Sequence, residues 1–342
     1  MRSAVIGCGN ISRFHFHAIM TNPLTELAAI CDVNPELAKR KAEELGGVKF
    51  YTRVDELLKN EKIDALHVLT PPHLHKEVAL PALEKGIHVL IEKPVALTVK
   101  DVEVMNKAAE KSGARLGVNH NMLYDPTYRR ARDIANSFAF GDLLHAEVFF
   151  GFDTRRVIGA NGLEGTWLKE MKGHFLQDLF PHPAAIIFDL LQNINTTHII
   201  KKNPGGDNIL KEEVRILFDA QNATAAINMS LSVKPDIFTL VLYGTKMIAR
   251  VDLSNMSIVK QKTWRRIPKA FARGVDSISQ SMQMFGNTIC VTAGVALKRI
   301  SPTAGMTNLI NAFYTSLDKD WPLPVSGQDA LKVIELSEKI WK

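Results

Sequence analysis

The sequence predicts an α/β fold class in two parts: an N-terminal doubly wound parallel sheet, then an α+β domain with a large open, mostly antiparallel sheet. Three observations predict it. The first 120 residues alternate short apolar runs with amphipathic stretches, and the runs are continuous in Val, Ile and Leu. After about residue 121, strand-like segments follow one another through short turns. Continuous apolar strands suit a parallel sheet covered on both faces, and closely connected strands suit antiparallel pairing.

In the N-terminal part, strands are expected at 3–7, 27–32, 64–70, 87–93 and 114–120. The helical segments between them span 35–47, 75–86 and 99–113. All three end on glycine, and the first also opens with proline, as helices tend to do. The alternation predicts right-handed βαβ units.

In the C-terminal part, strands are expected at 145–153, 212–220, 223–233, 238–253 and 256–262. Helices are expected at about 178–192, 269–298, 304–318 and 327–341. We therefore predict a dinucleotide-type domain over 1–121 and a substrate-binding and oligomerisation domain over 122–342. Residues 201–208 are expected to form a surface loop.

Net charge and cysteine content limit the kinds of ligand and the compartment that we expect for this chain. The 342 residues carry a net charge of +6 without a long basic block, which favours an anionic small molecule over nucleic acid. The three cysteines are far apart and lack metal-ligand spacing, so we expect no disulfide framework, no metal and a reducing cytoplasm.

The most apolar stretch, residues 284–299, is too short for a transmembrane segment, which needs roughly 20 apolar residues. We expect a buried or interface helix there, with contact to a membrane surface as the weaker alternative.

A glycine-rich turn follows the first strand in "AVIGCGNIS". Gly7 would allow the tight turn, and Gly9 would let the backbone approach a pyrophosphate. Ser12 stands where a third glycine often occurs. The amides of Asn10 and Ile11, at the start of the next helix, would point at phosphate.

Asp32 ends the second strand, in the position of a ribose-binding carboxylate. Such a carboxylate accepts hydrogen bonds from both ribose hydroxyls and repels a 2′-phosphate. No arginine follows it closely, so NAD is expected as the cofactor rather than NADP.

The tripeptide Glu92-Lys93-Pro94 ends the fifth strand. Ligands gather at the carboxyl ends of strands in open α/β sheets, so Lys93 is a candidate for contact with substrate. From the tripeptide alone, an exposed lysine at a strand end is the simpler interpretation.

Three longer segments accompany these motifs: "HVLTPPHLHKEVALPALEKGIHVLIEKPVAL", "NMLYDPTYRRAR" and "FLQDLFPHPAAIIFDLL". With them, the sequence resembles the glucose–fructose oxidoreductase / inositol dehydrogenase / MocA family of NAD(P)-dependent oxidoreductases. The resemblance implies a Rossmann domain followed by an α/β domain whose open sheet forms a homodimer or homotetramer. It also implies Lys93 as the catalytic lysine and Asn121 near the sugar. The residues implied near the cofactor are Thr70, Pro71, Pro72, His75 and Glu92.

Asp178 and His182 lie four positions apart and match the family's Asp-x-x-x-His spacing. The resemblance implies that His182 is the general acid/base and that Asp178 assists it. A base with a pKa near neutrality also suits oxidation of an alcohol. From local sequence alone, Asp178 could instead be a helix cap and His182 a partly buried histidine.

Two positions depart from the family pattern, Phe180 and Leu123, and both suggest altered specificity. Trp167 either stacks against a sugar or fills the domain junction. Arginines that could favour a phosphorylated or nucleotide-linked sugar are Arg129, Arg155, Arg156, Arg265 and Arg266. We predict a cytoplasmic NAD-dependent oxidoreductase that acts on a secondary hydroxyl or ketone of a sugar-like molecule. The alternative is an NAD-binding regulatory or scaffolding protein without turnover.

Overall fold

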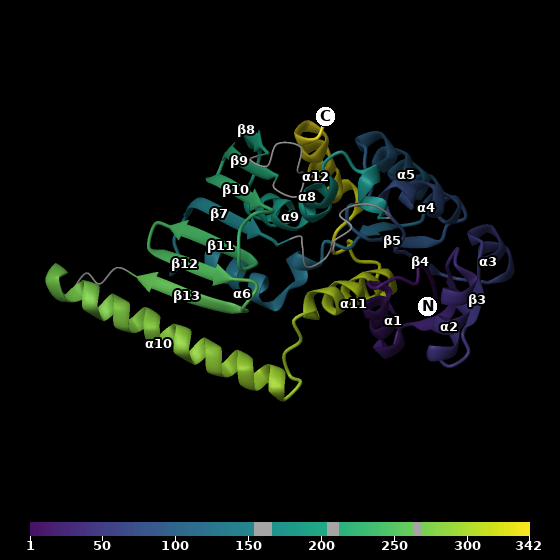
Figure 1. Ribbon diagram of the computed structural model, residues 1–342, viewed down its shortest axis with the longest axis horizontal. Coiled ribbons are helices and arrows are strands. Elements are labelled where there is room, and N and C mark those ends of the chain that lie inside the picture. The colour runs from purple at the N-terminus through teal and green to yellow at the C-terminus, as the bar shows by residue number, and fades with distance from the viewer. Residues whose placement is uncertain (154–165, 204–211, 263–267) are drawn as a thin grey trace. The chain divides into compact units, whose positions relative to one another are not determined.

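The computed structural model describes residues 1–153, 166–203, 212–262 and 268–342 (Figure 1). The chain forms two compact units. The first comprises Met1–Asn121, Glu170–Lys172 and Gly305–Lys342, and the second comprises Met122–Lys169 and Gly173–Ala304.

The first unit contains a six-stranded parallel sheet in the order β3-β2-β1-β4-β5-β6. Its strands are β1 (Arg2–Ile6), β2 (Glu26–Cys31), β3 (Lys49–Tyr51), β4 (Ala65–Val68), β5 (His88–Ile91) and β6 (Leu116–Val118). The central strands are almost completely buried, as their continuous apolar sequence predicts. The strand order reverses between β1 and β4, which is where ligands bind in such sheets.

Helices separate these strands and complete the first unit. They are α1 (Ser12–Thr21), α2 (Pro35–Glu44), α3 (Val54–Asn60), α4 (His75–Glu84), α5 (Val99–Ser112), α11 (Ala304–Asp318) and α12 (Gly327–Ile340), with the short 3-10 turn η1 (Pro72–Leu74) before α4. A second 3-10 turn, η2 (Asn121–Tyr124), starts at Asn121 and otherwise belongs to the second unit. Side chains cap several of them. Asn34 accepts hydrogen bonds from two amides of α2, Thr98 caps α5, and Ser326 forms a capping box with Asp329 in α12.

The second unit contains a seven-stranded sheet in the order β13-β12-β11-β7-β10-β9-β8. Its strands are β7 (Leu143–Gly151), β8 (Ile194–Lys202), β9 (Glu213–Ala220), β10 (Thr224–Ser230), β11 (Ile237–Gly244), β12 (Met247–Asp252) and β13 (Ser257–Lys262). Among the described strands of this second sheet only the β7–β10 pair is parallel, so the expectation of a mostly antiparallel open sheet is confirmed. Strand β8 was not predicted, because its polar sequence INTTHIIKK lies at the sheet edge and is largely exposed.

The helices of the second unit are α6 (Pro126–Ala135), α8 (His174–Leu179), α9 (Pro181–Leu190), α10 (Lys269–Ala296) and the 3-10 turn η3 (Trp167–Glu170). The predicted loop at 201–208 falls for the most part outside the described residues.

The division of the chain differs from the predicted boundary at residue 122, because Gly305–Lys342 groups with the first unit. Tyr314 of α11 is buried, and its hydroxyl donates a hydrogen bond to Ser3 Oγ of β1 at 2.7 Å. Val118 of β6 donates its amide to the carbonyl of Val325. These long-range contacts attach the C-terminal helices to the parallel sheet.

The apolar stretch at 284–299 lies mostly in α10, and of the two expected alternatives, a buried or an interface helix, burial within the chain is wrong. Most of its large apolar side chains are exposed. Within the described part of the chain, no helix is both long enough and apolar enough to cross a membrane.

Candidate active site at the carboxyl ends of the parallel strands

The turn after β1 needs glycine at Gly7 for steric reasons. Its φ is +97°, and a Cβ there would lie 2.8 Å from the carbonyl oxygen of Leu69. Gly9 differs, since a Cβ built on it meets nothing within 4 Å. Ser12 is buried and donates its hydroxyl to the carbonyl of Gly9 at 2.7 Å, which closes the turn. The open space beside Gly9 is the kind of cradle that a pyrophosphate occupies.

Helix α1 begins directly after this turn, and its start suits an anion. Ile11 is the N-cap residue and makes no side-chain cap hydrogen bond, and the first turn contains no acidic residue. Asn10 is exposed. Backbone amides at a helix start that no side chain caps are a favourable site for phosphate.

Asp32 lies beside the same turn. Its Oδ2 accepts the Cys8 amide at 2.8 Å, and its Oδ1 accepts the Asn34 amide at 2.9 Å. The carboxylate is therefore fixed next to the glycine turn, at the end of β2, where a ribose would need it.

Unsatisfied polar atoms collect at the carboxyl ends of β4 and β6, the strands on either side of β5. Thr70 Oγ1, both ring nitrogens of His120 and Asn121 Oδ1 are buried without a hydrogen-bond partner. Buried polar groups are normally paired, so such a group implies an unseen ligand or water. Together with the space beside Gly9, these atoms fit a dinucleotide and the polar end of its substrate.

Glu92 is held between these two strands by several donors. Asn119 donates its amide to Glu92 Oε1 at 2.5 Å, and His15 Nε2 lies 2.8 Å from the same oxygen. The backbone amide of Lys93 donates to Glu92 Oε2 at 3.2 Å. Burial alone would raise the pKa of Glu92, but the hydrogen bonds and the charges of His15 and Lys93 hold it below its usual range. Glu92 is thus an ionised, fixed anchor for the residue that follows it.

A chain of buried polar side chains continues from His15 away from Glu92. His15 Nδ1 and His67 Nδ1 share a hydrogen bond at 2.7 Å, and His67 Nε2 and the Tyr314 hydroxyl share another at 2.7 Å. Tyr314 in turn bonds to Ser3. Burial, and next the charge of His15, lower the pKa of His67 well below its ordinary value. We call these five side chains, Glu92, His15, His67, Tyr314 and Ser3, the buried polar chain.

His75 is completely buried and uses its ring to connect two turns. Its Nε2 lies 2.7 Å from the Thr70 carbonyl oxygen, and its Nδ1 lies 3.0 Å from that of Pro94. The expected role near the cofactor is therefore best understood as positioning of Thr70 and Pro94. Pro71 and Pro72 follow Thr70 in the segment that leads to His75, and Pro72 opens the 3-10 turn η1.

Asp178 and His182 lie in the second unit, one helical turn apart on consecutive helices, and both are half-buried. The cap alternative for Asp178 is wrong, because Asp178 lies inside α8 and Phe180 is the N-cap of α9. Phe180 is fully buried and adopts helical backbone angles, so it belongs to the core of this unit rather than to a substrate surface. Its bulk therefore gives no evidence for altered specificity.

Trp167 begins the turn η3 and is 37% exposed. Arg129 lies 5.4 Å over the ring of Tyr124. Arg155, Arg156, Arg265 and Arg266 lie outside the described residues. Among the residues that the structure does describe, no group of three or more His, Cys, Asp or Glu could hold a metal ion.

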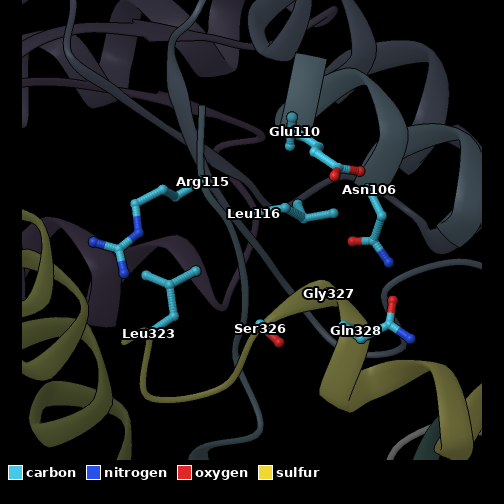
Figure 2. Close-up of a pocket in the computed structure, with 9 residues that line it drawn as sticks. Asn106, Glu110, Arg115, Leu116, Leu323, Ser326, Gly327 and Gln328 are labelled. Carbon is cyan, nitrogen blue, oxygen red and sulfur yellow. The ribbon is translucent and has the colours of Figure 1, made fainter. Parts of the chain in front are cut away.

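A separate hollow of about 330 Å³ lies in the first unit (Figure 2). Asn106 and Glu110 of α5 line it on one side, with Ser326 and Gln328 on the other. Arg115, also in its lining, directly precedes β6, so the hollow lies at the amino edge of the sheet. The candidate site is at the opposite edge.

Two of the histidines at the site, His120 and His15, were not among the predicted site residues. His120 lies between Asn119 and Asn121 directly after a buried strand, and three adjacent polar residues at that edge were the available signal. His15 sits on the buried face of α1, where sequence gives no reason to separate it from an ordinary core histidine.

This arrangement defines a dinucleotide-binding class of protein, and comparison with known proteins agrees. Residues 1–120 match the model of the oxidoreductase family with an NAD-binding Rossmann fold. The match covers the N-terminal part of the chain, where the resemblance implied a Rossmann domain. The predicted Rossmann fold with its parallel sheet is confirmed.

Among curated relatives, the chain is 28% identical over 220 residues to glucose-6-phosphate 3-dehydrogenase of Bacillus subtilis, covering 63% of this chain and 61% of that protein. It is 33% identical over 148 residues to 1,5-anhydro-D-fructose reductase of Ensifer adhaerens, covering 43% and 44%. The matches thus span about half of the length of these relatives.

Solved structures with the same fold cover nearly the whole chain. The WlbA dehydrogenase of Bordetella pertussis, solved with NADH and UDP-GlcNAcA, superposes with a TM-score of 0.77 at 21% identity over 100% of this chain and 94% of that one. An oxidoreductase of Agrobacterium radiobacter, solved with NAD+, L-tartaric acid and magnesium, gives 0.79 at 19% identity, with coverage of 99% and 94%. These similarities confirm the two-part fold.

Proposed function

We propose that this protein is an NAD-dependent oxidoreductase that transfers hydride between nicotinamide and a secondary hydroxyl or ketone of a sugar, polyol or nucleotide-linked sugar. The observation that carries the proposal is the cluster of buried polar atoms without partners at the ends of β4 and β6, beside the Glu92-Lys93 turn. A bound cofactor would supply the hydride acceptor or donor.

The proposed roles follow from the chemistry of a secondary alcohol. Its carbon loses hydride while its hydroxyl loses a proton, which His182 would take, with Asp178 supporting the imidazole. Lys93 would stabilise the charge that develops on the oxygen. Asn121 and Trp167 would hold the sugar. The residues proposed at the cofactor are Gly7, Gly9, Asn10, Ile11, Asp32, Thr70, Pro71, Pro72 and Glu92. His75 would position Thr70 through its hydrogen bond to the Thr70 carbonyl.

NAD is the expected cofactor because Asp32 is fixed beside the turn and accepts two backbone amides. A 2′-phosphate would be repelled by this carboxylate. Isothermal titration with NAD and NADP tests this assignment: NAD should bind at least about 10-fold more tightly, equivalent to about 1.4 kcal/mol. Equal affinities would contradict the role of Asp32.

A sugar-like substrate is supported by the names of the relatives, which act on glucose 6-phosphate and anhydrofructose, and by the UDP-sugar in a related structure. The net charge of +6 suits an anionic substrate better than a neutral one. We expect no nucleic-acid partner. Cys290 is an exposed free cysteine, which supports the cytoplasm as the compartment. The proposal also includes a homodimer or homotetramer that forms through the open sheet of the C-terminal domain.

The test is NADH formation across sugars, sugar acids, inositols and nucleotide sugars, with reduction of the matching ketones as the reverse assay. The proposal expects turnover with at least one member, and loss of that turnover in Lys93→Ala and His182→Ala. Tight NAD binding without turnover across the panel would favour the regulatory alternative instead.

A further inference from the structure

Helix α10 differs from an ordinary surface helix in which of its sides faces the protein. Figure 1 shows it running along β13, the edge strand of the seven-stranded sheet. Its polar residues face that strand, whereas its large apolar residues are exposed to solvent. A surface helix normally does the opposite, with an apolar stripe on the core and polar residues outward.

Hydrogen bonds from amide side chains attach the helix to the strand. Gln283 Oε1 accepts the Lys260 amide at 2.9 Å, and Gln283 Nε2 donates to the Lys260 carbonyl at 2.9 Å. Asn287 donates to the carbonyl of Ile258 at 2.8 Å. Asp276 accepts from Gln261 of β13 at 2.7 Å. The helix therefore satisfies backbone groups that an edge strand otherwise leaves unpaired.

The opposite side of α10 carries an apolar seam in a heptad pattern. Spacings of four and three residues alternate along it, as in the a and d positions of a coiled coil. Its members are Phe271, Val275, Ile278, Met282, Phe285, Ile289, Thr292 and Ala296. The five largest, Phe271, Ile278, Met282, Phe285 and Ile289, are 52–70% exposed. We call this set the α10 seam.

The seam lacks the charges that keep an isolated helix in water. Between Asp276 and Lys298 the sequence contains no charged residue. A second copy of the same surface would therefore meet no like charge. Isologous contacts need such self-complementarity, and a heptad seam of alternating large apolar residues provides it.

We infer that the α10 seam is a second surface, separate from the sheet face, through which two copies of this chain associate. The helix has 28 residues, so it is about 42 Å long. Phe271 and Phe285, each 70% exposed, leave roughly 200–350 Å² of aromatic surface per copy. With the three other large side chains and the rest of the seam, the area is of the order of the ~800 Å² per partner that a stable interface buries.

The open face of the seven-stranded sheet, through which the resemblance implies assembly, is a surface separate from the seam, and side-chain polar pairs lie on it. Asn228 donates to Glu147 at 2.9 Å, and His145 bonds to Thr224 at 2.8 Å. As the partner of the α10 seam, a membrane surface is a weaker candidate than a second copy of this chain. Interfacial helices carry lysine and arginine on their polar face, whereas the polar face of α10 carries Asp276, Gln283 and Asn287.

The experiment is sedimentation velocity on the full chain over a range of concentrations, with Phe285→Glu as the test variant. Ser277→Glu is the matched control, since it adds the same charge to an exposed position of α10 outside the seam. We expect the wild type and the control to show at least twice the 38.0 kDa mass of the chain. Phe285→Glu should halve the assembly and weaken association at least about 100-fold, with an unchanged circular dichroism spectrum.

A second variant makes the result independent of that substitution. Met282 lies near the middle of the seam, so Met282→Cys in a Cys290→Ser background should form a disulfide-linked dimer on mild oxidation. Ser277→Cys in the same background should not. A monomeric wild type overturns the inference, whether or not it binds vesicles of phosphatidylcholine and phosphatidylserine. An assembly that Phe285→Glu leaves intact overturns it too. The outcome does not depend on whether the protein turns over a sugar.

Discussion

The buried polar chain of the first unit and the α10 seam of the second both reverse the usual placement of side chains. Glu92, His67 and Tyr314 are polar and buried, whereas Ile278 and Phe285 are apolar and exposed. The two regions differ in how the reversal is compensated. Each group in the buried polar chain has a hydrogen-bond partner within its own unit. The large side chains of the seam remain exposed in the described structure.

The buried polar chain therefore affects the stability of the folded chain, whereas the α10 seam affects its association with another molecule. A buried polar group that loses its partner costs free energy of folding, because it cannot return to water. An exposed apolar side chain costs little within one chain, and removing it affects contact with another molecule. A substitution in the buried polar chain should therefore lower the free energy of unfolding, whereas one in the α10 seam should weaken the association of two copies.

The largest effect is expected at Lys93, which follows the anchored Glu92. Lys93→Ala should lower kcat/KM for an identified substrate about 1,000-fold or more, because a charge-stabilising group is lost. NAD affinity should change much less. Steady-state kinetics and NAD titration on the same preparation measure both, and wild-type turnover in the variant would remove Lys93 from the chemistry.

Tyr314→Phe should destabilise the folded state by about 2 kcal/mol, because it leaves His67 Nε2 and Ser3 Oγ buried without the hydroxyl they contact. Chemical unfolding at neutral pH measures the change. Tyr243→Phe is a control on the second sheet, at a half-buried tyrosine. Equal losses in both variants would mean that the buried polar chain has no special role.

Lowering the pH should destabilise the first unit through its buried histidines. Burial, aided by the charge of Lys93, lowers the pKa of His120 to about 4, against an ordinary value of 6.5. The unfolded chain therefore takes up a proton below about pH 6.5 while the folded chain does not, so stability falls as the pH drops towards 4. His120 alone should contribute a loss of about 2 kcal/mol between about pH 7.5 and pH 5.

Unfolding of wild type and His120→Gln at both pH values checks this prediction. The variant should lose less stability on acidification, although His67 and His75, whose pKa values are also lowered by burial, will still contribute. An identical pH dependence in the two proteins would show that His120 is not held neutral.

The smallest effect is expected from Phe285→Glu on the stability of a single chain. Because Phe285 is 70% exposed, its substitution should change the unfolding free energy by about 0.5 kcal/mol or less at concentrations where the chain is monomeric. Its effect should appear only in association. A loss as large as that of Tyr314→Phe would show that the side chain is buried within its own chain.

Much of the fold and the cofactor turn could be predicted from sequence because their determinants are local. Gly7, Gly9 and Asp32 are set by the requirements of one turn and the strand beside it. The same holds for the parallel strands, whose continuous apolar runs need no knowledge of distant residues. Helix α10 was also predicted within two residues of its bounds.

The remaining features depend on distant contacts. Periodicity located the apolar stretch of α10 but could not tell which side faces β13, since that depends on the backbone of Ile258 and Lys260. The C-terminal helices joined the first unit through Tyr314 and Ser3, which are 311 residues apart. Phe180 was expected at the substrate because of its position in a motif, whereas packing places it in the core.

The central claim is that the turn after β1 binds NAD, and Gly9 tests it most directly. Because a Cβ on Gly9 meets no protein atom within 4 Å, Gly9→Val should fold normally and fill only the space proposed for the pyrophosphate. Isothermal titration with NAD should show wild-type binding and a loss of about 100-fold or more in the variant, about 2.7 kcal/mol, with unchanged unfolding. Equal NAD affinity in the two proteins, or no binding by the wild type, would contradict the account.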